Sequence, residues 1–333
     1  MKKKLLSFLA IALTATVFTS CTTASKKITF MDNWASNIFN APAEGATETL
    51  TYAVTFEKGT SLHEDAYTVE YGKNESGKQD GEYTTTFTYA NGQFTYETTL
   101  TLPGVYTFNE EHRYFTDVVT TTAVFENAQN SLRPISSVKR VKSTTPRNVD
   151  ATKWEECYTE YDYEVKIDYT GDTGNVTWTN FSSVQNIITT PKSFTIDDKE
   201  YTYLDNEQVL FAIRGFQKNA MSTTQTLLSY DASKMMMRKI EVAPSSAESS
   251  KDFNFTVNGN PIPADTAIDY VPVSSSYTDD MGGAPQLLWY AQMGTDEVGN
   301  PINQYRNVLL RMEVDAPYAI GTIVYSLKSA IFA

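Results

Sequence analysis

The chain has 333 residues, of which 40 are acidic and 27 are basic, and its formal net charge at pH 7 is −13. This excess of acid argues against a nucleic-acid partner, which needs a basic face on the protein. It also argues against broad electrostatic adhesion to an anionic membrane surface.

The first twenty residues have the pattern of an export signal. Lys2, Lys3 and Lys4 precede an apolar run from Leu5 to Phe18. A membrane-spanning helix needs about 20 apolar residues, so this run fits the hydrophobic region of a secretory signal instead. The segment Phe18-Thr19-Ser20-Cys21 that follows resembles the lipobox of bacterial lipoproteins.

That resemblance implies that residues 1–20 are a lipoprotein signal peptide and that Cys21 is the site of lipid attachment. The protein would then be exported and anchored to the cell membrane by its lipidated N-terminal cysteine. The diacylglycerol of this family supplies two acyl chains, which hold a protein stably. The alternative is an ordinary secretory signal with a chance cysteine. Residues 21–44 are expected to form the lipidated tether and a short helix over 31–39.

The second cysteine, Cys157, lies among acidic neighbours. If Cys21 is acylated, Cys157 has no partner for an intramolecular disulfide, and the exported domain depends on its own core. Glu155, Glu156 and Glu160 would raise the pKa of the thiol rather than lower it. The sequence therefore predicts a partly buried, unreactive cysteine rather than a nucleophile.

Residues 45–333 are predicted to form a single β-rich domain. Strand-forming Thr, Tyr, Phe and Val are abundant, and their periodicity is two. In residues 161–169 every odd position is apolar or aromatic and every even one is charged, which indicates a strand with one buried face. Asn91-Gly92, between two alternating segments, predicts a two-residue hairpin turn. Further strands are expected over 48–57, 65–71, 114–125, 137–142, 193–197, 226–231, 236–243, 253–257, 307–314 and 319–328, and long loops over 143–150, 244–251 and 272–286.

Helices are expected to be scarce, and the best candidate covers residues 205–214. Asp205 can cap the N-terminus of this helix, and Gly215 can end it. Val209, Leu210 and Ile213 would form its apolar face.

The order of these segments resembles a family of uncharacterised exported bacterial proteins whose half-barrel is related to the periplasmic lipoprotein carriers. The resemblance rests on residues 48–56, on the helix DNEQVLFAIRGF (205–216) and on the closing NVLLRMEVDAPYAIGTIVYSLKS (307–329). It implies a large curved antiparallel sheet, a half-barrel or open barrel, with one or two short helices on its concave side. In the carriers the concave side holds an apolar cavity, so Val209, Leu210, Phe211 and Ile213 would line such a cavity here.

Motifs for enzymatic chemistry are few. Only two histidines, His63 and His112, are available for a metal site or a Ser-His-Asp triad, so the sequence favours neither kind of site. No cofactor or metal is expected. Ser136-x-x-Lys139 matches a penicillin-interacting tetrad, but it lies in a β-rich stretch and lacks a Lys-Thr-Gly partner. Met235-Met236-Met237 fits core packing better than a pliable ligand lining.

Two pairs of carboxylates could hydrolyse glycosides. These pairs are Asp279-Asp280 and Asp296-Glu297, and both lie near Trp289 and Tyr290 in the sequence. The neighbouring residues of each pair are more typical of a solvated turn than of a catalytic site.

The favoured function is therefore a membrane-anchored, non-enzymatic envelope lipoprotein that binds an apolar or lipid-like ligand, either a lipid or a lipoprotein-derived molecule. The alternative is a carbohydrate-binding or structural envelope protein, and a weaker one is a carboxylate-dependent glycoside hydrolase. A carrier needs a continuous apolar concavity, whereas a sugar binder needs exposed aromatic rings beside amides or acids.

Overall fold

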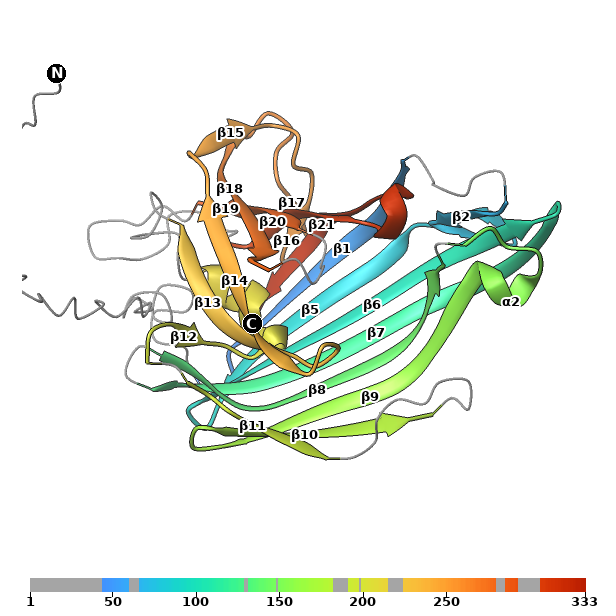
Figure 1. The fold of residues 1–333 in the computed structure, drawn as a ribbon. Coiled ribbons are helices and arrows are strands. Elements are labelled where there is room, and N and C mark those ends of the chain that lie inside the picture. Colours follow the sequence, from blue (N-terminus) through green and yellow to red (C-terminus); the bar gives the residue numbers. More distant parts are fainter. Residues whose placement is uncertain are drawn as a thin grey trace, which may run out of the picture.

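The computed structural model describes residues 44–59, 66–128, 131–147, 149–181, 191–197, 199–214, 224–279, 285–292 and 306–333. In this part of the chain the protein is mainly β, as predicted, with a curved sheet of 19 strands and only short helices (Figure 1). The strand pairings are antiparallel except for two short parallel ones, so the sheet is mixed rather than purely antiparallel.

The first half of the sheet is a meander in which each strand pairs with the next one along the chain (Figure 1). Its strands are β5 (Gly81–Ala90), β6 (Gln93–Phe108), β7 (Glu111–Ala128), β8 (Ser131–Pro146), β9 (Tyr158–Thr170), β10 (Thr173–Asn180) and β11 (Lys192–Thr195). The predicted turn joins β5 to β6. Asn91 and Gly92 have φ angles of 53° and 73°, the positive values that a tight two-residue hairpin turn requires.

The first strand, β1 (Thr47–Lys58), joins the two halves of the sheet because it pairs with β5 on one side and with β21 (Gly321–Phe332) on the other. From β21 the sheet continues through β20 (Leu309–Asp315), β19 (Gln286–Ala291), β18 (Ile268–Tyr277), β14 (Met236–Pro244), β13 (Gln225–Asp231) and β12 (Thr202–Tyr203). Shorter strands complete it: β2 (Thr68–Tyr71), β15 (Glu248–Ser250), β16 (Thr256–Val257) and β17 (Asn260–Pro261), with β3 (Lys73–Asn74) and β4 (Gly77–Lys78) as a separate hairpin.

The two ends of this curved sheet meet through aromatic side chains. The Phe194 ring of β11 stacks on the Tyr230 ring of β13, with centroids 4.0 Å apart and planes at 5°. Tyr169 and Tyr203 join them in a small apolar cluster, separate from the main core. Side-chain stacking thus brings the ends of the sheet together and encloses its concave side.

The predicted helix at 205–214 is confirmed and packs on the concave side. Asp205 forms a capping box with Gln208 and starts a short 3₁₀ turn, η1 (Asn206–Gln208), that leads into α3 (Val209–Ile213). The Phe211 ring stacks on Phe87 at 4.4 Å and contacts the rings of Tyr96 and Phe125 at 5.4 and 5.7 Å. Burial of Phe211 against β5, β6 and β7 therefore fixes the helix on the sheet.

Two further short helices lie in the described residues. The short helix α2 (Trp154–Cys157) directly precedes β9 and was not predicted, and η3 (Pro317–Ala319) connects β20 to β21. The predicted helix over 31–39 and the predicted cap Gly215 lie outside the described residues.

Three predicted loops are partly wrong. Residues 143–146 extend β8, residues 248–250 form β15, and β18 runs to Tyr277 inside the predicted loop 272–286. The Ser and Pro content of β18 predicts a loop from local propensity. Pairing with β14 and β15 on one side and with β19 on the other overrides that propensity.

In the described part of the chain, no helix is both long and apolar enough to cross a membrane.

Candidate ligand-binding cavity

A cavity of about 840 Å³, here called the large chamber, lies on the concave side of the sheet. Strands β8, β9 and β10 line one side of it. The N-terminal end of the 205–213 helix and the turn between β13 and β14 form its sides, together with residues 315–318. Its size is within the range of small-molecule sites.

One wall of the large chamber is apolar and aromatic. It consists of Tyr163, Val165 and Ile167 of β9, Trp178 of β10 and Tyr230 of β13. The alternation predicted for 161–169 is confirmed here, because the odd positions Tyr163, Val165 and Ile167 face the cavity. The Tyr163 and Trp178 rings are half-buried and 5.2 Å apart, so they present ring surface to the chamber.

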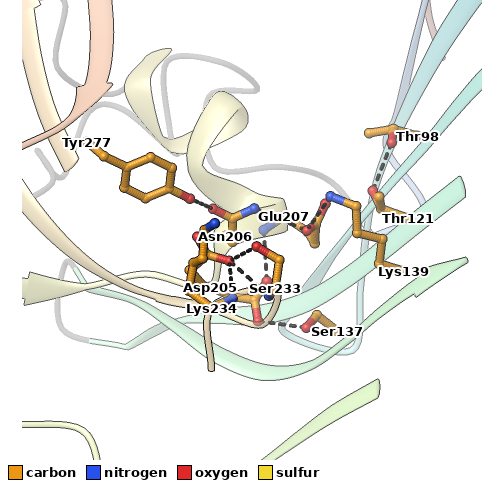
Figure 2. A network of polar contacts seen from close by, with 11 residues as sticks. Thr98, Thr121, Ser137, Lys139, Asp205, Asn206, Glu207, Ser233, Lys234 and Tyr277 are labelled. Carbon is orange, nitrogen blue, oxygen red and sulfur yellow. Dashed lines mark hydrogen bonds and ion pairs between the residues drawn. The ribbon is translucent and has the colours of Figure 1, made fainter. Parts of the chain in front are cut away.

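A second, charged wall lies beside it: Lys139 of β8 is the cross-strand neighbour of Val165 of β9 and forms an ion pair with Glu207. The Lys139 Nζ lies 3.1 Å from Glu207 Oε1 (Figure 2). The Glu207 carboxylate raises the pKa of Lys139, so the ammonium stays charged at neutral pH. A protonated lysine cannot serve as the general base of a serine–lysine pair, which argues against that chemistry at this wall.

Asp205 anchors the same wall. Its carboxylate accepts hydrogen bonds from Ser137 Oγ at 2.6 Å, from the Tyr169 hydroxyl and from the Glu207 backbone N–H at 2.9 Å. Burial raises the pKa of Asp205, and these donors oppose that rise. The partners are those of a helix cap, so the main role of Asp205 is to hold η1 against the sheet.

Arg238 closes the end of this wall. It donates to Asp231 at 2.8 Å and to both carboxylate oxygens of Asp279 at 2.6 and 3.0 Å. Its guanidinium also lies 3.5 Å from the centroid of the Tyr277 ring. Asp279 is therefore the acceptor of a buried arginine. Its predicted partner Asp280 and the other pair, Asp296-Glu297, lie outside the described residues.

A second cavity of about 320 Å³, the small chamber, is lined by strands of the same sheet and by the helix. Strands β6 and β7 contribute Leu100, Val119 and the hydrogen-bonded hydroxyls of Thr98 and Thr121, 2.8 Å apart (Figure 2). Strands β14, β18, β20 and β21 supply the facing wall. Most of this lining is apolar, aromatic or hydroxyl-bearing.

The four residues predicted to line an apolar cavity lie in two different environments. Val209 and Leu210 line the small chamber. Phe211 and Ile213 are each 1% exposed and belong to the packed core. Cys21, the predicted lipid attachment site, lies outside the described residues.

Other sequence motifs do not form sites. Ser136 and Lys139 lie three residues apart on a strand, so they point to opposite faces of the sheet. Met235 and Met236 are 36% and 38% exposed at the β13–β14 turn, so the prediction that they pack in the core was wrong. Cys157 is buried, and burial raises the pKa of its thiol, as expected for an unreactive cysteine. Within the described residues, no cluster of His, Cys, Asp and Glu could hold a metal ion.

The polar residues at the centre of the two chambers were missed by sequence reasoning. Lys139, Asn206, Glu207 and Tyr277 come from β8, η1 and β18, which are far apart in the chain. The capping signal at Asp205 places η1 in the sequence, but nothing local indicates which strands face it.

No family model and no curated protein matches this chain. Among solved structures, one described as a beta-barrel-like protein of domain of unknown function DUF1849, from Brucella abortus, covers 87% of this chain and 99% of its own, with 9% identity and a TM-score of 0.49. An enduracididine biosynthesis enzyme, MppR, gives 8% identity and a TM-score of 0.10 over 87% of this chain and 90% of its own.

Proposed function

We propose that this protein is an exported, lipid-anchored and non-enzymatic component of the cell envelope that binds an amphiphilic, lipid-like ligand on the concave side of its sheet. The observation that carries this proposal is the large chamber, in which an aromatic and apolar wall lies beside a charged one. A molecule with one apolar and one polar part would satisfy both walls.

The anchor rests on the sequence at the N-terminus. An apolar run that ends at Cys21 matches a lipoprotein signal, and two acyl chains on one cysteine hold a protein at a membrane without help from surface charge. Replacing Cys21 with alanine in the producing cell should leave the protein without acyl chains and shift it from the detergent phase to the aqueous phase in a partition experiment. Equal retention of the variant in the detergent phase would contradict the anchor.

The charges in the large chamber favour an uncharged or zwitterionic polar group. Its lining includes four acidic and three basic side chains. Arg238 is engaged by two aspartates, and Lys139 is engaged by Glu207. Because these charges are largely matched, a ligand of high net charge would leave some of them unpaired. Apolar burial would supply most of the binding free energy, and the polar groups would orient the ligand.

Carbohydrate binding is the second candidate, and one observation favours it. Tyr163 and Trp178 present half-buried rings in the same chamber as the amide of Asn206 and the carboxylate of Glu207. This pairing of rings with amide and acid groups is the arrangement that we expect of a sugar site.

Titration with three probes separates these functions: decyl maltoside below its micelle concentration, maltose and decanoate. The protein would be the full mature chain, residues 21–333, with Cys21→Ser so that no detergent is needed. We expect saturable binding of decyl maltoside and weak or no binding of maltose. Equal binding of maltose and decyl maltoside would support the carbohydrate function, and no binding of any probe would refute both.

A matched pair of variants locates the site. Trp178→Ala should weaken decyl maltoside binding about fivefold or more, because a ring facing the ligand is lost. Tyr114→Ala removes an exposed aromatic ring of β7 that does not line either chamber, and it should leave binding unchanged. If both variants bind like the parent protein, the ligand does not occupy the large chamber.

A further inference from the structure

The large and small chambers share four lining residues: Lys139, Asn206, Glu207 and Tyr277. We call these four residues the partition. Figure 2 shows them meeting at the N-terminal end of the helix, with Lys139 on one side of Glu207 and Tyr277 reaching Asn206 from the other. Because both cavities touch the same four side chains, the partition is what separates one cavity from the other.

The partition is held by bonds between side chains. Lys139 Nζ lies 3.1 Å from Glu207 Oε1, Asn206 Nδ2 donates to the same oxygen at 3.2 Å, and the Tyr277 hydroxyl donates to Asn206 Oδ1 at 3.1 Å. Side-chain rotation alone can break all three bonds, so opening the partition requires no change in strand pairing. The Lys139 side chain is 35% exposed, which means that water can solvate its ammonium when Glu207 moves away.

The two chambers differ in chemistry. In the large chamber, charged side chains other than those of the partition include Asp205, Asp231, Arg238 and Asp315. In the small chamber, the charged lining residues are Lys139 and Glu207, both of which belong to the partition. Beyond the partition, a ligand would meet the apolar side chains of Leu100, Val119, Val209, Leu210 and Met312, beside the uncharged polar groups of Ser275, Ser276 and Gln286. An alkyl chain would lose little by entering this space, whereas a charged headgroup would lose its solvation.

We propose that the small chamber is a compartment for the alkyl chain of an amphiphile whose headgroup occupies the large chamber, and that the chain enters when the partition opens. This inference rests on the proposed function and adds to it the position of the tail and the residues that limit its length. The hydroxyls of Thr98 and Thr121 bond to each other, which leaves their methyl groups to contact an alkyl chain.

The inference predicts how affinity changes with chain length. Each methylene that leaves water and enters the small chamber should raise affinity by up to about fourfold, or about 0.8 kcal/mol. Octyl, decyl and dodecyl maltoside, titrated below their micelle concentrations into the full mature chain with Cys21→Ser, should therefore bind with increasing affinity. From octyl to dodecyl, which differ by four methylenes, the gain should reach roughly two hundredfold at most.

Filling the small chamber should remove that gain. Val119 lines this chamber, whereas Val118 is the preceding residue of the same strand and points to the opposite face. Val119→Phe should abolish the increase in affinity with chain length, and Val118→Phe should keep the full increase. Should Val119→Phe fail to give a cooperative thermal transition, Val314→Phe on β20 fills the chamber from the facing wall.

The partition has its own test. Lys139→Met combined with Glu207→Gln keeps both side-chain volumes but removes the ion pair. The association rate of dodecyl maltoside, measured by stopped-flow tryptophan fluorescence, should rise severalfold in the double variant. An unchanged rate would show that the ion pair does not control entry.

The outcomes for the two proposals can be told apart. If no maltoside binds the parent protein, the proposed function fails. If maltosides bind but their affinity does not depend on chain length, or if Val119→Phe keeps that dependence, the proposed function stands and the tail compartment is refuted.

Discussion

Arg214, at the end of the helix, forms a buried ion pair with Glu48 of β1. Its Nη1 and Nη2 lie 2.6 and 3.0 Å from the two carboxylate oxygens of Glu48, and Nη2 also donates to Asn307 Oδ1 at 3.1 Å. The two charged side chains are 4% and 2% exposed. Glu48→Gln would leave an arginine charge buried without its counter-ion.

We expect Glu48→Gln to lower the free energy of unfolding by about 3–5 kcal/mol, measured by urea denaturation. The double variant Glu48→Gln with Arg214→Met removes both charges, and it should be clearly less destabilised than the single variant. If the double variant loses more unfolding free energy than the single one, the ion pair stabilises the fold by more than the cost of one unpaired buried charge.

Asp117 of β7 gives a pH-dependent prediction. It is 8% exposed, and burial raises the pKa of its carboxyl to about 7, although the Thr144 N–H donates to it at 2.7 Å and opposes the rise. Between pH 4 and pH 7 the native state therefore keeps a proton that the unfolded chain has lost, since the ordinary pKa is 3.8. This group makes stability fall as the pH rises through that window.

Asp117→Asn removes this titration and keeps an oxygen that can accept from Thr144. Relative to the parent protein, the variant should gain stability as the pH rises from 4 to 7, by on the order of 3 kcal/mol in total, and the difference should be constant above about pH 8. Urea denaturation of both proteins across this range measures the difference. A difference that does not depend on pH would contradict the raised pKa of Asp117.

At the scale of elements, the helix at 205–213 carries two apolar side chains in different surroundings. Phe211 is 1% exposed and contacts the rings of Phe87, Tyr96 and Phe125, whereas Leu210 is half-buried and lines the small chamber. Phe211→Ala should cost about 3–5 kcal/mol of unfolding free energy, and Leu210→Ala about 1–2 kcal/mol. Equal losses in urea denaturation would mean that the small chamber is packed as tightly as the core.

The sequence predicted those elements whose signals are local. The capping residues at Asp205 start the helix, Asn91-Gly92 closes a hairpin, and the alternation over 161–169 assigns each side chain of β9 to a face. The strand β18 was missed because Pro272 and three consecutive serines oppose a strand locally. Its pairing with strands on both sides is a property of the whole sheet, which no short window contains.

At the scale of the molecule, period-two alternation says which side chains turn inward but not whether they fill the space that they enclose. Ile213 and Val209 belong to the same predicted apolar face, yet Ile213 is packed in the core and Val209 borders a cavity. The difference depends on which strands stand opposite, and those strands are distant in the chain. The candidate site was therefore predicted only at Val209 and Leu210, while the partition came from the structure.

The last prediction concerns the aromatic contact between the two ends of the curved sheet. The stack of Phe194 on Tyr230 joins the two ends of the sheet, and Gly174 of β10 makes room for it, since a Cβ at this position would lie 2.2 Å from Phe194 Cζ. Gly174→Val should displace the Phe194 ring and weaken the contact between β11 and β13. An aromatic pair contributes about 0.5–1.5 kcal/mol, so local opening should become about two- to tenfold more frequent.

Hydrogen exchange followed by mass spectrometry measures this opening. In the Gly174→Val variant, amides of β11 and β12 should exchange about two- to tenfold faster, while those of β5, β6 and β7 keep their rates. Asn175→Ala, at the adjacent exposed position, is the matched control and should change neither region. Faster exchange throughout the sheet would indicate global destabilisation instead of a weakened contact between β11 and β13. Unchanged exchange in β11 and β12 would mean that the aromatic stack does not hold the two ends together.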